Sequence, residues 1–163
     1  MAFTVSTYAG GQQIATKDTT QNHPLGTIVR GHDPTYGEGE FIYCKGAAST
    51  IAGSIVEYTT SFQTGLATSA TANPRPLAVA MTTTTASYYG WYQISGLAQI
   101  AKATSLSLVA DAYIGAAAGL AIAAASGKRL HGAQVAVVAS AVSGTAPDTV
   151  TVMINRPIDT GDV

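Results

Sequence analysis

Alternating apolar and polar positions in Asn73–Lys102 predict the β-structure around which the chain is organised. Within residues 77–82 every second residue is a larger apolar one, which is the period of two expected of a strand. The alternation resumes over residues 88–95, and Gly96 separates it from a third short strand over residues 97–101. We expect this stretch to form a central hairpin or meander on which the rest of the chain packs.

The same alternation predicts further strands. The two cleanest patterns lie over residues 40–45 and 149–155, and Arg156-Pro157 directly after the second predicts its end. Residues 25–30, 54–59 and 134–142 give shorter or weaker strand patterns. Glycine, proline and serine between these segments are typical of turns.

An alanine-rich stretch over residues 116–126 leaves a short helix and a strand or loop as open alternatives. Alanine favours a helix, but Gly115 and Gly119 interrupt the run and it has no amphipathic period. Several short strands with turn signals between them are typical of barrels and sandwiches. The sequence therefore predicts a mainly β protein, a compact β-barrel or β-sandwich with at most one or two short helices.

The first 34 residues differ from the rest because their apolar residues are scattered among turn and linker residues. One interpretation is a frayed terminal tail. The other is an extended arm that docks on a neighbouring subunit. We expect an extended N-terminal arm over residues 1–34 and a β-rich core domain over residues 35–163.

Charged residues make up 10% of the chain, against roughly 25% in an average soluble protein. The net charge of −1 provides no bulk attraction to nucleic acids or anionic membranes. No apolar run reaches the roughly 20 residues that a membrane span needs, and no signal peptide is visible, so we expect synthesis in a cytoplasm. A surface with few charges is poorly protected against self-association, which predicts that partners cover much of it.

No motif in the sequence carries catalytic, cofactor-binding or metal-binding chemistry. The three histidines lack partners at metal-ligand spacing. Cys44 lies in a predicted strand and is interpreted as a small core residue. Glu38 and Glu40 lie on a glycine-rich loop, where carboxylates are more often solvated turn residues than an acid/base pair. We therefore expect no enzymatic activity, no cofactor and no metal.

Aromatic residues gather around Trp91, the only tryptophan. A nucleic-acid stacking platform would need a basic stripe, and none accompanies them. A carbohydrate-binding shelf would need the rings on one face, but alternation distributes them over both faces of the strand. We therefore interpret them as core or subunit interface. The candidate interface residues are Phe3, Tyr8, Ile14, Tyr36, Tyr89, Trp91 and Tyr92.

Three segments resemble virion proteins of tailed bacteriophages: residues 23–30 (HPLGTIVR), 33–46 (DPTYGEGEFIYCKG) and 89–96 (YGWYQISG). The resemblance implies a role like that of head decoration, or cement, proteins, which are small β-rich proteins that bind the outside of the expanded capsid. It implies the major capsid protein as a partner, a homo-oligomer with a trimer favoured and a dimer possible, and a place on the capsid exterior. The alternative left open is a carbohydrate- or host-receptor-binding module of a phage fibre or tail.

Overall fold

A computed structural model describes residues 4–5, 12–68, 75–125, 129–140 and 148–159 of the 163-residue chain. All regular secondary structure in these residues is β, so none of them forms a helix that could cross a membrane. The strands are β1 (Thr4–Val5), β2 (Lys17–Asp18), β3 (Ile28–Asp33), β4 (Gly37–Lys45), β5 (Ile55–Tyr58), β6 (Thr64–Leu66), β7 (Arg75–Ala80), β8 (Tyr89–Lys102), β9 (Ile114–Ala117), β10 (Leu120–Ala123), β11 (Leu130–Val135) and β12 (Asp148–Asp159). The mainly β prediction is confirmed.

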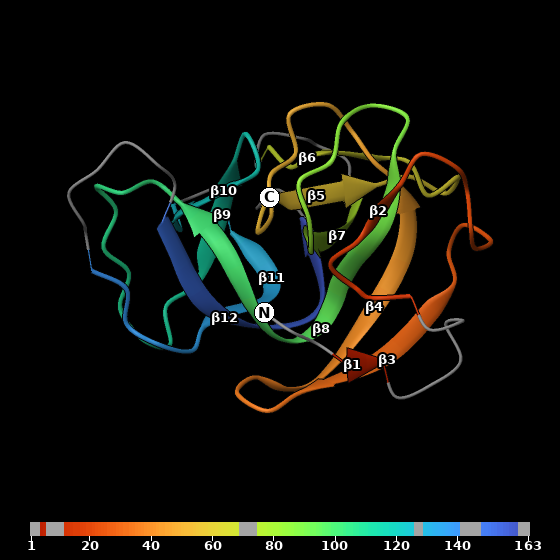
Figure 1. Cartoon of the computed structure of the whole chain (residues 1–163). Helices are drawn as coiled ribbons and strands as arrows, with labels where there is room; N and C mark the ends of the chain where they lie inside the picture. The colour runs from red at the N-terminus through yellow and green to blue at the C-terminus, as the bar shows by residue number, and fades with distance from the viewer. Residues whose placement is uncertain (1–3, 6–11, 69–74, 126–128, 141–147, 160–163) are drawn as a thin grey trace.

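The strands form one 12-stranded sheet that is almost entirely antiparallel and does not close into a barrel (Figure 1). Its main path runs β1-β3-β4-β8-β12-β7-β5-β6. The strand with the most partners is β8, which pairs with β2, β4, β7, β10 and β12. The prediction of a central β segment over Asn73–Lys102 is therefore confirmed for its described residues, 75–102; residues 73 and 74 lie outside them.

Gly96 bends β8 but does not end it, so the predicted division into two strands is wrong (Figure 1). Gly96 has a φ of 100°, and a Cβ atom there would lie 2.3 Å from the carbonyl oxygen of Glu38. A glycine is required because L-residues rarely adopt this conformation and the backbone of β4 leaves no space. The two halves of β8 consequently pair with different strands, residues 89–95 with β4 and residues 95–102 with β12.

The other long strand, β12, also continues past its predicted end. Arg156 has a φ of 44°, and Pro157 follows it within the strand. The partner strand β11 has an irregularity in register between His131 and Ala133 at this level. A bulged ladder tolerates the proline because a local break in the pairing removes the need for its amide hydrogen.

The alanine-rich stretch forms a β-hairpin, so the helix alternative is wrong. Strand β9 pairs with β10, and the two turn residues Ala118 and Gly119 both have positive φ. Two-residue turns with this conformation match the twist of antiparallel strands. Ala116 and Ala121 are buried against the sheet, where larger side chains would not fit so closely.

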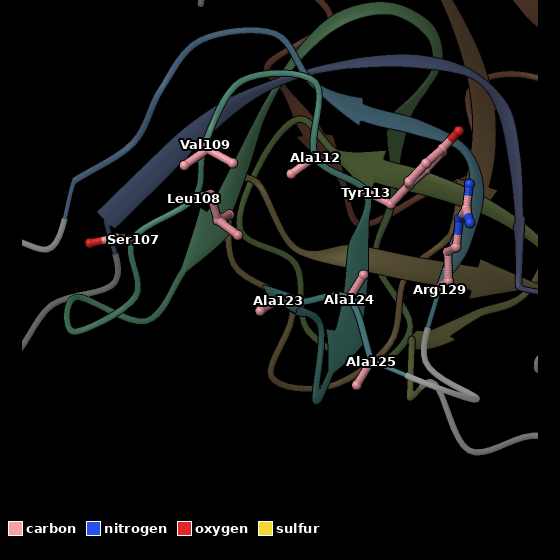
Figure 2. Close-up of a pocket in the computed structure, with 9 residues that line it drawn as sticks. All are labelled: Ser107, Leu108, Val109, Ala112, Tyr113, Ala123, Ala124, Ala125 and Arg129. Carbon is pink, nitrogen blue, oxygen red and sulfur yellow. The ribbon is translucent and has the colours of Figure 1, made fainter.

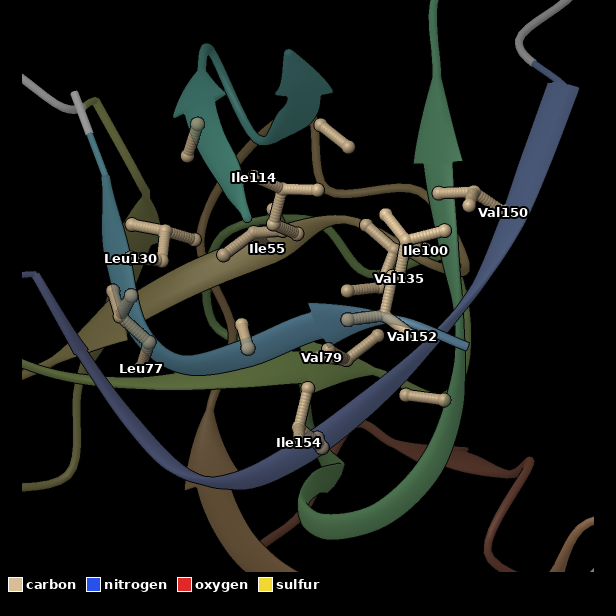
Figure 3. Packing of buried hydrophobic residues seen from close by; sticks show 14 of the residues in the cluster. Ile55, Leu77, Val79, Ile100, Ile114, Leu130, Val135, Val150, Val152 and Ile154 are labelled. Carbon is tan, nitrogen blue, oxygen red and sulfur yellow. The ribbon is translucent and has the colours of Figure 1, made fainter. Parts of the chain in front are cut away.

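Three buried clusters make up the core. An aliphatic cluster lies under the second half of β8 and includes Ile100, Leu130 and Val152 (Figure 3). An aromatic cluster on one face of β4 and the first half of β8 consists of Ile14, Val29, Phe41, Tyr43, Met81 and Trp91. A third cluster on the opposite face consists of Ile42, Cys44, Val56, Ala78, Ala80, Tyr92 and Ile94. Phe41 and Tyr43 thus face one side of β4, and Ile42 and Cys44 face the other, which confirms the alternation predicted for residues 40–45.

The described part of the predicted N-terminal arm belongs to the same sheet. Ile14 is buried in the aromatic cluster, β2 pairs with β8, and β3 forms a hairpin with β4. The predicted boundary at residue 34 falls at the tip of that hairpin, where an Asp33 carboxylate oxygen accepts backbone hydrogen bonds from Thr35 and Tyr36. Residues 12–34 are thus part of the domain and not a detached arm.

Candidate interaction surface

Three of the predicted interface residues are core residues in this structure. Trp91, Tyr92 and Ile14 are 0%, 1% and 2% exposed, so their side chains contact the chain itself and not a partner. They are buried because both faces of this half of the sheet are covered. Tyr36 and Tyr89 are half-buried and pack against the aromatic cluster. The remaining two, Phe3 and Tyr8, lie outside the described residues.

Hydrogen bonds to the chain itself occupy the polar edges of the aromatic cluster. The ring centroids of Tyr43 and Trp91 lie 5.0 Å apart, and the His23 ring lies within 5.2 Å of both. The Tyr43 hydroxyl donates to Asp18 at 2.8 Å, and the Trp91 indole nitrogen donates to Gln12 Oε1 at 3.4 Å. Burial and the Asp18 carboxylate raise the pKa of Tyr43 far above its usual value. The cluster therefore anchors the segment that follows Gln12 and offers no open aromatic shelf.

Glu38 and Glu40, the two glutamates that the sequence analysis weighed as an acid/base pair, have separate partners. Glu40 contacts Arg30 at 3.2 Å and Arg156 at 2.8 Å. Glu38 contacts His32 at 3.1 Å. Two carboxylates with separate partners are poorly placed to share acid and base roles. No cluster of metal-ligating side chains occurs among the described residues.

Cys44 is fully buried, and its burial raises the pKa of the thiol to about 12. Nucleophilic cysteines need the thiolate form near neutral pH, so this thiol is inert in the folded chain. The prediction that Cys44 is a small core residue is confirmed.

A buried lysine, which sequence reasoning did not single out, lies where β8 meets β12. Lys102 is 0% exposed, and its Nζ atom contacts Asp148 Oδ2 at 2.9 Å and the carbonyl oxygens of Leu106 and Ser140 at 3.0 and 3.1 Å. The hydrogen bond from Lys102 lowers the pKa of Asp148. All three donors of the ammonium group are satisfied, so Lys102 clamps three segments and is not a reactive amine.

Exposed apolar side chains lie together on the side of the molecule that carries the aliphatic cluster. Leu108 and Ala139 are joined by two backbone hydrogen bonds, which places their outward-facing neighbours Val109 and Val138 beside each other. The pairing of Tyr113 with Gln134, and of Gln134 with Met153, continues the surface across β11 and β12. We call this surface the apolar ridge. Its members, with their exposed fractions, are Val109 (67%), Tyr113 (42%), Val137 (58%), Val138 (60%) and Met153 (49%).

A groove of about 540 Å³ adjoins the apolar ridge. It is lined by apolar residues of the segments 108–113 and 123–125, with the guanidinium of Arg129 at one end (Figure 2). Arg129 lies over the ring of Tyr113, with its Cζ atom 3.2 Å from the ring centroid. Its Nε atom is buried and has no hydrogen-bond partner among the described residues.

Sequence reasoning selected the aromatic residues and missed the apolar ridge. One signal was present, because Val137 and Val138 are consecutive and point to opposite faces of an extended segment, so at least one of them is exposed unless both faces are covered. Comparison of the sequence with protein-family models and with curated proteins finds no match.

Proposed function

We propose that this protein is a structural component of a tailed-phage virion that binds the outer surface of the major capsid protein and stabilises the capsid. The observation that carries the proposal is the apolar ridge, with exposed fractions of 42–67% on one side of the chain. Exposed apolar patches on soluble proteins mark surfaces that partners cover. The three phage-like segments make a virion the expected setting.

The environment of the ionisable groups favours assembly over catalysis. Glu40 and Lys102 are each held by more than one partner, and Cys44 is protonated and buried. Nucleophiles and general bases need access to a substrate and a pKa matched to the reaction. Glu40, Lys102 and Cys44 do not combine these two properties, which supports a structural role.

A carbohydrate- or host-receptor-binding module of a fibre or tail is the alternative that the aromatic residues suggested. It loses that support because Trp91 is 0% exposed and its indole nitrogen points to Gln12 of the same chain. A titration of tryptophan fluorescence with host glycans should accordingly leave the emission unchanged. No other feature of the described residues favours this alternative.

Binding to capsids tests the proposed function directly. Expanded heads assembled from the major capsid protein of the phage that encodes this chain would be incubated with the purified full chain and sedimented. We expect saturable co-sedimentation and a higher temperature of head disruption. An unrelated soluble protein of similar mass serves as the control. Failure of the chain to bind the heads above this control would contradict the proposed function.

A further inference from the structure

We propose that the apolar ridge is a contact surface between copies of this chain, in which Asp111 of one copy pairs with Arg129 of the next. The proposal goes beyond the proposed function, which names the major capsid protein and not a second copy as the partner. It concerns the free protein, however, and its test does not require a capsid.

The apolar part of the surface supplies the area that such a contact would bury. Val109 and Val138 are neighbours across a backbone bridge, and both are at least 60% exposed. Tyr113 extends the same surface toward Arg129 (Figure 2). An amphipathic aromatic ring bordered by valines is typical of the centre of protein interfaces, where aromatic residues and arginine are enriched.

The charges on this surface distinguish a second copy from other occupants. Arg30, Arg75 and Arg156 each pair with a glutamate of the same chain. Arg129 has no such carboxylate partner among the described residues, and one of its nitrogen atoms is buried without a hydrogen bond. The buried Nε atom is closed to a partner, so an incoming carboxylate would bind the terminal nitrogen atoms of this half-buried arginine, whose planar guanidinium suits a carboxylate.

Asp111 is the carboxylate that a second copy would bring. It is exposed and lies two residues before Tyr113, and its backbone is fixed by hydrogen bonds to Val135 and Gln134. No ion pair joins Asp111 to Arg129 or to another described residue of the same chain. One surface therefore carries both an unpaired anion and an unpaired cation.

A surface that carries both charges is complementary to itself. In a closed ring of identical copies around an axis beside Tyr113, Asp111 of each copy can meet Arg129 of the next. In this arrangement Asp111 and Arg129 of every copy are both paired, and the same pairing is possible in a dimer or in a trimer. Complementary charges of this kind fix the register of an interface whose area is provided by apolar contacts.

The first experiment measures self-association of the full chain by sedimentation equilibrium at several concentrations. Val138→Asp places a charge in the apolar ridge and should weaken association by at least about tenfold, since an unpaired charge would be desolvated. Ile28→Asp is the matched control, because Ile28 is 46% exposed but lies on β3, which β4 and β8 separate from β12 in the strand order. We expect the control to associate like the wild type.

The second experiment exchanges the charges. Asp111→Arg and Arg129→Asp should each weaken association by about tenfold or more, and the double variant should restore most of it. Asp111 has a φ of 61°, a conformation that asparagine tolerates better than arginine. Asp111→Asn is therefore measured as well, and it should weaken association while leaving the thermal midpoint of the folded chain unchanged.

The outcomes separate this inference from the proposed function. A wild-type chain that is monomeric at all concentrations overturns the inference, and so does an oligomer that Val138→Asp and Asp111→Asn leave intact. A monomer that nevertheless binds phage heads overturns the inference but keeps the proposed function. An oligomer that depends on the ridge but ignores the heads supports the inference and contradicts the proposed function.

Discussion

The two halves of β8 belong to one strand, but they are packed in different ways. In residues 91–94 every side chain is buried, because the aromatic cluster covers one face and the third cluster covers the other. Beyond Gly96, buried and partly exposed residues alternate over residues 97–100: Ala98 and Ile100 are fully buried, while Leu97 and Gln99 are partly exposed. Ala101 and Lys102 at the end of the strand are again fully buried. The first half is complete within one chain, and the second half presents a sheet face to the surroundings.

The charged residues follow the same division. On the side of β3 and β4, Arg30 and Arg156 both form ion pairs with Glu40 at the rim of the sheet. On the side of β9–β12, the cation Arg129 and the anion Asp111 have no ion-pair partner in the described part of the chain. Burial and charge pairing therefore distinguish the two regions, and the region with the unpaired charges is the one that we propose a second copy covers.

Removal of the indole ring should produce the largest effect, because the first half of β8 depends on its aromatic core. Trp91→Ala should lower the free energy of unfolding by about 3–5 kcal/mol through lost burial and the cavity left behind. Val138→Ala, on the exposed side, should change it by less than about 0.5 kcal/mol. Urea denaturation of both variants, followed by circular dichroism, checks the contrast. Similar losses for the two variants would contradict the division between the halves.

The junction between the halves should be nearly as sensitive. Gly96→Ala should cost about 2–4 kcal/mol, since its φ of 100° disfavours a side chain and the new Cβ would overlap the Glu38 carbonyl. Gly90→Ala in the same strand is the matched control, because no atom lies closer than 3.7 Å to a Cβ at that position and its φ is ordinary. Thermal denaturation should separate the two variants clearly. A Gly96→Ala chain as stable as Gly90→Ala would show that the bend is not required.

The period-two pattern predicted much of the first half correctly. It placed Phe41 and Tyr43 on one face of β4, and it separated Trp91 from Tyr92, because alternation along a strand is a local property. Burial is not local, so the sequence could not show that both faces are covered and that Trp91 is therefore unavailable to partners. A glycine such as Gly96 signals an unusual backbone, but the local pattern does not distinguish a strand end from a bend.

The alanine-rich segment that pairs with the second half of β8 was harder to predict because its side chains are small. Alanine fits a helix, a strand or a loop, and only the pairing of β9 with β10 decides in favour of the hairpin over residues 114–123. The scattered apolar residues of the first 34 positions gave no period, although Ile14 is buried against the aromatic cluster. The apolar ridge consists of apolar side chains that no other segment in the described part of the chain covers. Which valines remain uncovered depends on contacts between segments that are distant in the sequence.

The Lys102 clamp should give the second half a distinct dependence on pH. The folded-state pKa of Asp148 lies below its ordinary value of 3.8 because Lys102 donates to it, so the folded chain binds this proton less readily than the unfolded chain. The stabilisation is complete above the ordinary value and is lost as the pH falls through the lowered one. Lys102→Met should therefore flatten the decline of the thermal midpoint in this acid range. Parallel pH profiles for the variant and the wild type would exclude this role of the pair.

The smallest effect on stability should come from the exposed ion pairs. Its dependence on salt distinguishes an arginine that has a carboxylate partner from one that has none. Arg30→Gln removes a cation whose side chain is 71% exposed beside Glu40, so it should cost about 0.2–1 kcal/mol at low salt. The difference should fade at roughly 1 M salt, where charges are screened within about 3 Å.

Arg129→Gln, measured at concentrations where the chain is monomeric, should lose only the stacking on Tyr113, about 0.5–1 kcal/mol. Its loss of stability should vary less with salt than that of Arg30→Gln, because no carboxylate of the described residues pairs with it. Salt should instead weaken the association of the wild-type chain. If the folding stability of Arg129→Gln is as salt-dependent as that of Arg30→Gln, the guanidinium has a carboxylate partner within its own chain, and it is then not free to receive Asp111 from another copy.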